Sequence, residues 1–201
     1  MKLLLATTSP GKLREQKDAL QGLDLEIVSL EDFPAVEPPD EAGATFRENA
    51  RLKALYYHRA LGLPSVAEDA GLEVDAVGGL PGVHSARWLG AETPYEAKNA
   101  RLLELLKDVG EADRTAHYVS AVALADEGEI VFEHEAVCEG RIAFEPRGAS
   151  GFGYDPIFYY PPLLKTMAEL SPGEKNKVSH RGKAFAALRR HLSGPRIGRP
   201  L

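Results

Sequence analysis

The chain has 201 residues, with 24 lysines and arginines against 30 aspartates and glutamates, which gives a formal net charge of −6 at pH 7. This acidic balance argues against a general nucleic-acid-binding protein, because such proteins usually carry a clustered basic face. Hydrophobic residues make up 44% of the sequence and charged residues 27%, a globular composition that excludes a largely disordered chain.

The sequence predicts a soluble, cytoplasmic protein with no membrane partner. No apolar run approaches the roughly 18 to 20 residues that a bilayer-spanning helix needs, and the apolar start at residues 1–6 is too short for the core of a signal peptide. The single cysteine, Cys138, has no partner for a disulfide or a zinc site, so we interpret it as a small buried residue.

The first third of the chain alternates strand and helix patterns. Residues 2–8 form an apolar run that is followed by a Ser-Pro-Gly turn and a charged, periodic stretch over 12–23, which predicts a strand, a tight turn and a helix. A second strand is expected over 25–30. Residues 31–43 carry five acidic residues and three prolines without any period, so they are expected to form a long loop.

Two helix starts carry capping signals. Thr45-Phe46-Arg47-Glu48 fits a capping box that opens a helix to about Leu61, and Thr93-Pro94 opens another helix to about Val109. Between these helices we expect a short buried strand over 64–69 and a glycine-rich irregular segment over 71–90.

The remaining chain is rich in strand patterns and ends in a helix. The expected elements are a hairpin of 115–125 with 129–138, a strand near 141–145, a helical turn at 168–170, an amphipathic helix over 178–192 and a flexible C-terminal tail over 193–201. Together these patterns predict an α/β protein with a mixed central sheet, split into two lobes.

Thr7-Thr8-Ser9-Pro10-Gly11-Lys12 is the first candidate site. A strand-to-helix turn directs unpaired backbone amides and the positive end of the helix dipole toward an anion, and the hydroxyls and Lys12 suit a phosphate. The spacing of a Walker A loop is absent. The simpler interpretation is that Ser9 only caps a helix.

Acidic residues form the second candidate site. Asp40-Glu41 lies in the long loop, and Glu68-Asp69 ends an apolar strand immediately before Ala70-Gly71. Carboxylates at the carboxyl end of a strand suit Mg²⁺, which binds through one or two carboxylates plus substrate phosphates. A solvated acidic surface is the alternative.

Two further clusters suit a ring-shaped ligand. Glycines flank two aromatic residues and an acid in Gly151-Phe152-Gly153-Tyr154-Asp155-Pro156, and flat rings stack on nucleobases. Downstream of Lys175, the segment Ser179-His180-Arg181-Gly182 places two cations in a first helical turn, which an electron-rich ligand would stabilise. A turn with core aromatics is the alternative for the first cluster.

Two isolated cations complete the candidates. Lys53 lies in the middle of a predicted helix, one turn after Asn49, and taken alone it is most simply a solvated residue. Arg87 follows the glycine-rich segment and is a candidate for a mobile cation over a pocket.

With these clusters in order, the sequence resembles the inosine/xanthosine triphosphate pyrophosphatase family from Leu3 to about Leu192. The resemblance is carried by four motifs: Glu68-Asp69-Ala70-Gly71-Leu72, Gly79-Leu80-Pro81-Gly82, Phe152-Gly153-Tyr154-Asp155-Pro156, and Glu174-Lys175 with Ser179-His180-Arg181-Gly182. It implies a single domain over residues 1–192, with an elongated mixed sheet flanked by helices and an active-site cleft between two lobes.

The resemblance also implies an activity: a Mg²⁺-dependent, homodimeric hydrolase that cuts deaminated purine nucleoside triphosphates (ITP, dITP, XTP) between the α and β phosphates and so cleanses the nucleotide pool. Asp69 would be the catalytic residue. The implied metal ligands are Glu41, Glu68 and Asp69. The implied substrate-binding residues are Thr7, Thr8, Ser9, Lys12, Lys53, Ala70, Arg87, Phe152, Gly153, Tyr154, Asp155, Lys175, His180 and Arg181.

Two positions depart from the family's usual residues, because Ser9 stands where asparagine is usual and Ala70 where serine or threonine is frequent. These departures leave two other hypotheses. One is a Maf-like pyrophosphatase for modified nucleotides, which Ser9-Pro10 resembles. The other is a non-catalytic nucleotide sensor.

Overall fold

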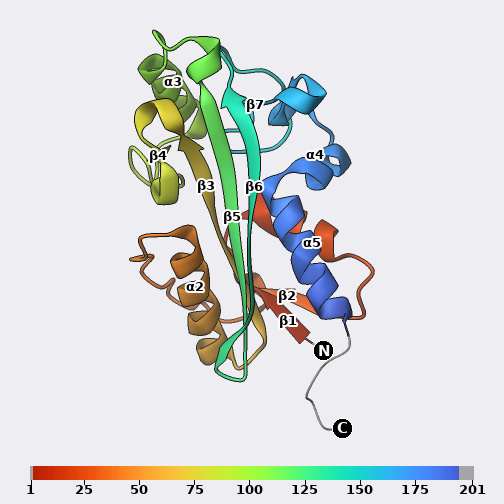
Figure 1. The fold of residues 1–201 in the computed structure, drawn as a ribbon. Coiled ribbons are helices and arrows are strands. Elements are labelled where there is room, and N and C mark those ends of the chain that lie inside the picture. Colours follow the sequence, from red (N-terminus) through yellow and green to blue (C-terminus); the bar gives the residue numbers. More distant parts are fainter. Residues whose placement is uncertain (1, 195–201) are drawn as a thin grey trace.

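The computed structural model of the protein describes residues 2–194. One mixed sheet runs through the molecule in the order β2-β1-β3-β5-β6-β7-β8, with the short β4 paired to β3 (Figure 1). The strands are β1 (Lys2–Leu5), β2 (Glu26–Ser29), β3 (Ser65–Val74), β4 (Leu80–Pro81), β5 (Thr115–Asp126), β6 (Glu129–Ile142), β7 (Phe158–Tyr160) and β8 (Lys165–Thr166). The helices are α1 (Pro10–Leu20), α2 (Phe46–Leu61), α3 (Tyr95–Leu105), α4 (Pro172–Val178) and α5 (His180–Ser193).

Helices cover both faces of the sheet. Strand β1 pairs in parallel with β2 and β3, whereas β3, β5 and β6 form a long antiparallel ribbon. Helix α2 packs on one face, α1 and α5 pack on the opposite face, and α3 lies over the far end of the ribbon (Figure 1). This arrangement confirms the predicted mixed α/β fold with a central sheet flanked by helices.

The front of the chain follows the predicted pattern because its local signals are strong. Ser9 caps α1 and Pro10 occupies the first helical position, while Thr45 and Glu48 form the reciprocal capping box of α2. The long loop before α2 is irregular apart from a single 3₁₀ turn at Leu30–Asp32. The hairpin of β5 and β6 is also confirmed.

The predicted irregular segment over 71–90 is wrong at its start, because β3 continues to Val74. Gly71 lies within the strand, where a Cβ atom would come within 2.6 Å of the Gly82 carbonyl oxygen. This glycine therefore permits a close approach of two chain segments and does not mark a turn.

The prediction of a separate strand near 141–145 is also wrong. Arg141 and Ile142 continue β6, and the buried guanidinium of Arg114 then binds the carbonyl oxygens of Ile142 at 2.8 Å and Ala143 at 2.9 Å. The Arg114 side chain thus binds the two carbonyl groups at the point where β6 ends.

Three short elements, β7, β8 and α4, are absent from the sequence prediction, because segments of two to seven residues show no clear period. The last helix begins at His180 after the N-cap Ser179 and includes Ser193, where the tail was expected to start. The rest of that expected tail, 195–201, lies outside the described residues. Among residues 2–194, no helix is long and apolar enough to cross a membrane.

Candidate active site

The turn between β1 and α1 has the geometry of an anion-binding site. Thr7 Oγ1 accepts a hydrogen bond from the Ser9 amide at 3.2 Å, and Ser9 Oγ accepts one from the Lys12 amide at 3.4 Å. No acidic residue lies in the first turn of α1. No side chain of this turn therefore neutralises the positive end of the α1 dipole, which favours binding of an anionic group.

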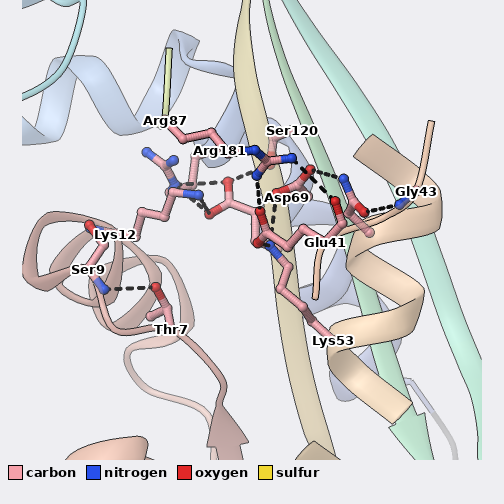
Figure 2. Close-up of polar contacts among 12 residues, drawn as sticks. Thr7, Ser9, Lys12, Glu41, Gly43, Lys53, Asp69, Arg87, Ser120 and Arg181 are labelled. Carbon is pink, nitrogen blue, oxygen red and sulfur yellow. Dashed lines mark hydrogen bonds and ion pairs between the residues drawn. The ribbon is translucent and has the colours of Figure 1, made fainter. Parts of the chain in front are cut away.

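A carboxylate pair lies beside this turn, on the α2 side of β3. The Lys53 ammonium binds Glu41 Oε1 at 2.7 Å and Asp69 Oδ1 at 2.8 Å, so one nitrogen brings the two carboxylates together (Figure 2). Asn49 donates to Asp69 Oδ2 at 3.2 Å, and Arg87 binds Glu41 Oε2 at 2.8 Å. The long acidic loop thus contributes Glu41 to the same site as Asp69 of the buried strand β3.

The charges of this group stabilise one another. Burial lowers the pKa of Lys53, but Asp69 and Glu41 outweigh that effect and raise it. Burial raises the pKa of Glu41, yet the charges of Lys53 and Arg87 lower it overall. Lys53 and Glu41 are consequently ionised near neutral pH.

Glu68 does not join the pair, because successive residues of a strand point to opposite faces of the sheet. Its oxygens accept hydrogen bonds from Arg181 Nε at 2.9 Å, Ser120 Oγ at 2.7 Å and Gln16 Nε2 at 3.1 Å, all on the α1 and α5 side. The structure therefore does not bring the expected three metal carboxylates together, and no group of three such residues among 2–194 is arranged to hold a metal ion.

The cationic partners of Glu68 keep it charged despite burial. Desolvation raises the pKa of this carboxyl, but Arg181 and Lys12 hold it well below its usual range. Lys12 Nζ lies 4.0 Å from Glu68 Oε2, and burial lowers the pKa of Lys12. Lys12 of the turn between β1 and α1 thus reaches the buried pair of Glu68 and Arg181.

A small cavity of about 60 Å³ opens beside Lys12. It is lined by Lys12, Ala70, Gly71, Leu72, Ser85, Ala86, Tyr95, Tyr118, Phe152, Gly153, Tyr154, Asp155, Lys175, His180 and Arg181. The structure thus brings the aromatic segment, the two-cation segment and the first turn around one space, although the first turn lies more than 100 residues before the other two segments in the sequence.

Asp155 fixes the aromatic segment from within. Its Oδ2 accepts from the Phe152 amide at 2.9 Å and from Lys175 at 2.5 Å, and its Oδ1 accepts from the Tyr118 hydroxyl at 3.3 Å. Burial raises the pKa of this carboxyl, while Lys175 opposes the shift. The Phe152 ring lies below Lys175, whose nitrogen is 4.7 Å from the ring centroid.

His180 is a neutral hydrogen-bonding ring in the cavity wall. It stacks on Tyr118 with the ring centroids 4.5 Å apart, and burial together with the charge of Arg181 lowers its pKa well below the usual value. Its buried Nδ1 has no hydrogen-bond partner among the described residues. Such an atom is available to a ligand group of matching polarity.

Arg87 and Thr8 are placed differently from the other expected substrate-binding residues. Arg87 is held by Glu41 and does not line the cavity, although its neighbours Ser85 and Ala86 do. No hydrogen bond of the Thr8 side chain occurs within residues 2–194. In this structure the Arg87 guanidinium binds Glu41, and its closing over a base stays a prediction.

Several residues of the site were not predicted from the sequence. Glu15 binds Lys175 at 2.8 Å and Arg181 at 2.5 Å, and Gln16 binds Glu68. Helical spacing could have identified both residues, because they follow Lys12 by three and four positions and therefore share its face of α1. No comparable signal identifies Ser120 or Tyr118, which lie on β5 and reach the site only through sheet pairing.

The fold and the site together define an α/β protein that combines three features suited to a nucleotide. These are an anion-binding helix turn, a carboxylate pair, and a cavity lined by aromatic and cationic side chains. The sequence model of the Ham1 family matches residues 3–191. The chain belongs to the Ham1 family.

Relatives and solved structures agree with this assignment. The chain is 48% identical over 188 residues to a dITP/XTP pyrophosphatase of Thermus thermophilus, covering 94% of this chain and 90% of the relative. It is 47% identical over 190 residues to a dITP/XTP pyrophosphatase of Syntrophobacter fumaroxidans, covering 94% and 81%. The structure of a HAM1 protein from Coxiella burnetii superimposes with a TM-score of 0.87 at 38% identity, covering 96% and 98%.

Proposed function

We propose that this protein is a hydrolase that cleaves ITP, dITP and XTP between the α and β phosphates, releasing a nucleoside monophosphate and pyrophosphate. The observation that carries the proposal is the junction of the first turn of α1 with the cavity of Phe152 to Arg181 through Lys12, which lines both. A triphosphate and its base thereby find complementary groups in one continuous region. Relatives named dITP/XTP pyrophosphatase support the same substrates.

Glu41 and Asp69 fit a Mg²⁺ ion. They are two oxygen-donor carboxylates within 2.8 Å of one Lys53 nitrogen, and Mg²⁺ commonly takes one or two carboxylates plus phosphate oxygens. When bound, Mg²⁺ would neutralise phosphate charge and favour an ionised water. Glu68 would instead hold Arg181 and Lys12 in place.

The chain's own groups supply the remaining steps of the hydrolysis. The amides and hydroxyls of Thr7 to Lys12 would hold the triphosphate, and Lys53 would turn from its carboxylates toward a phosphate oxygen. Asp69, fixed by Asn49, would orient the attacking water and accept its proton. Anhydride hydrolysis needs little more than positioning and charge stabilisation.

Base selection would rest on the cavity of Phe152 to Arg181. Phe152 offers a stacking face, and Arg181 keeps Nη2 without a partner among residues 2–194 because Glu68 and Glu15 take Nε and Nη1. A 6-oxo purine presents an acceptor to such a donor, whereas adenine presents an amino donor. A mispaired buried donor costs roughly 1 to 3 kcal/mol, which corresponds to about tenfold to over a hundredfold in selectivity.

The proposal includes a cytoplasmic homodimer that acts on the free nucleotide pool. A Maf-like activity on modified nucleotides and a non-catalytic sensor are the competing functions. The contact of Lys53 with Asp69 disfavours a sensor, because a sensor has no need of a water-orienting carboxylate beside a phosphate site.

Pyrophosphate and orthophosphate release from ITP, XTP, GTP and ATP with Mg²⁺ tests the function. We expect pyrophosphate from ITP and XTP, with lower rates for GTP and ATP. Orthophosphate release, or equal rates on all four, would contradict the proposal. Binding of ITP without turnover would favour the sensor, and activity confined to modified nucleotides would favour the Maf-like hydrolase.

A further inference from the structure

Helix α3 carries two buried polar residues to which the proposed mechanism assigns no task. The first, Lys98, is only 1% exposed, and its Nζ donates to the Ala86 carbonyl oxygen at 2.5 Å. Among residues 2–194 no carboxylate pairs with it, and burial lowers its pKa. The centroid of the Tyr95 ring lies 4.9 Å from this nitrogen, but a ring face compensates a buried ammonium less than a carboxylate does, so stability alone gives little reason for a lysine here.

The second residue, Asn99, is 5% exposed and follows Lys98 directly. Its Nδ2 donates to the Gly153 carbonyl oxygen at 3.2 Å, while its Oδ1 is buried without a partner among the described residues. The Gly153 oxygen fixes the orientation of the amide, because the flipped amide would place two acceptors together. Asn99 therefore keeps one hydrogen bond although its other polar atom is unsatisfied, which is again unfavourable for stability.

The two carbonyl groups belong to different walls of the cavity. Ala86 lines the wall formed by the segment after β4, and Gly153 lies within the aromatic segment, in a left-handed conformation with φ +71°. Consecutive helical residues point about 100° apart, so Lys98 and Asn99 reach two separate segments from one rigid helix.

Two tyrosines complete this connection. Tyr95, at the start of α3, lines the cavity and packs edge to face on Tyr154 with ring centroids 5.3 Å apart. The Tyr154 hydroxyl donates to the Ser85 carbonyl oxygen at 2.9 Å, which ties the two walls to each other. The distance between the Ala86 wall and the Gly153 wall is thus set by the contacts of both walls with α3 and by the hydrogen bond from Tyr154 to Ser85.

We propose that Lys98 and Asn99 are positioning residues that hold the Ala86 and Gly153 walls at the separation required to recognise a 6-oxo purine. This inference rests on the proposed function. Selection by hydrogen bonding demands that donors stay within about 0.5 Å of their productive positions. Because the cavity is only about 60 Å³, a small relaxation of either wall changes which base fits.

The test compares Lys98→Met and Asn99→Leu with the wild-type protein, using kcat and KM for ITP and ATP and the midpoint of thermal unfolding. Both substitutions keep approximate size while removing the donor. We expect the ratio of kcat/KM for ITP to that for ATP to fall by about five- to tenfold, the equivalent of one lost hydrogen bond, mainly through a higher KM for ITP. We expect thermal stability to change little, because Lys98→Met removes a buried ammonium that has no carboxylate partner and Asn99→Leu removes an unsatisfied oxygen, while each variant also leaves one carbonyl oxygen without its donor.

Three further variants make the result specific. Lys98→Arg and Asn99→Gln retain a donor and should restore part of the ITP preference, and they keep the test available should an apolar variant fail to fold. Arg101→Ala, an exposed position on the same helix, should behave like the wild type. An unchanged ITP to ATP ratio in the folded variants, or equal losses on both nucleotides with reduced stability, would overturn the inference. Absence of ITP hydrolysis by the wild-type protein would instead refute the proposed function.

Discussion

Asp69 is the residue on which the proposed chemistry depends most. Its carboxylate is fixed by Lys53 on one oxygen and by Asn49 on the other. Asp69→Asn keeps the shape and removes the negative charge, so we expect kcat for ITP to fall by at least about 100-fold. Circular dichroism should show an unchanged fold.

The matched control for this change is Asp75→Asn. Asp75 follows directly after β3, lies half-exposed and contacts Thr115 and His117 far from the cavity. We expect wild-type turnover from it. Wild-type turnover from Asp69→Asn would exclude the carboxylate from the reaction.

Arg181 and Glu68 form a buried ion pair whose members stabilise each other. Arg181→Met leaves Glu68 as a charged side chain without its main partner, which typically destabilises a protein by about 3 to 5 kcal/mol. Adding Glu68→Gln removes that charge and retains one acceptor oxygen for the donors Ser120 and Gln16. We therefore expect the double variant to be more stable than Arg181→Met alone.

Urea unfolding of the two single variants and the double variant measures this coupling. Purely additive losses in the double variant would show that the pair is not coupled. The same data decide whether a loss of base preference in an Arg181 variant reflects recognition or a damaged fold.

At the level of elements, β3 explains what the sequence could and could not predict. The apolar run before Glu68-Asp69 predicts a candidate site at the end of a strand. In the structure β3 continues to Val74, so both carboxylates lie within the strand. Which carboxylate faces the proposed metal site depends on which helix covers which face of the sheet. That follows from the pairing of β3 with β1 and β5, which the sequence does not encode locally. Lys12, Lys53 and Arg181 were identifiable for the opposite reason, because each lies on a helix with clear capping or periodicity.

The junction of α4 and α5 shows how a glycine fixes the relation of two helices. A Cβ on Gly182 would lie 1.8 Å from the Asn176 carbonyl oxygen, whereas a Cβ on Gly173 would meet nothing within 4 Å. Gly182→Ala should therefore destabilise the protein by about 1 to 3 kcal/mol through overpacking. It should also raise KM for ITP, since α4 carries Lys175 and α5 carries Arg181.

Gly173→Ala is the natural control, because it places the same methyl group in α4 without a clash. Helix propensity predicts an effect between zero and roughly 1 kcal/mol in the stabilising direction. Thermal or urea unfolding would record both variants. Equal stability of the two would contradict the close contact at Gly182.

At the scale of the whole molecule, the site is assembled from both faces and from distant parts of one sheet. Glu41 and Asp69 lie on the α2 side, while Lys12 and Arg181 come from α1 and α5 on the other (Figures 1 and 2). A nucleotide that spans these groups would connect elements that otherwise meet only through the sheet. Ligand binding should therefore stabilise the entire fold and not one element alone.

Mg²⁺ and nucleotide are expected to bind cooperatively. Lys53 and Arg87 already neutralise Glu41 and Asp69, so Mg²⁺ alone meets only two compensated carboxylates and should raise the melting temperature little. A non-hydrolysable ITP analogue brings phosphate oxygens that complete the metal's ligands and draw Lys53 away. At about 100 times the dissociation constant, a ligand stabilises by about 2.7 kcal/mol, or roughly 5 to 11 °C for a chain of this size.

Thermal unfolding with Mg²⁺, with the analogue and with both together measures the cooperativity, and the combined shift should exceed the sum of the separate shifts. Glu41→Gln removes a carboxylate ligand but leaves the anion-binding turn intact, so it should reduce the excess while preserving the shift by the analogue alone. Because the excess measures the free energy by which each ligand promotes binding of the other, it must appear equally when Mg²⁺ is titrated into the analogue complex. A combined shift equal to the sum, or a full shift by Mg²⁺ alone, would contradict a metal site completed by the substrate.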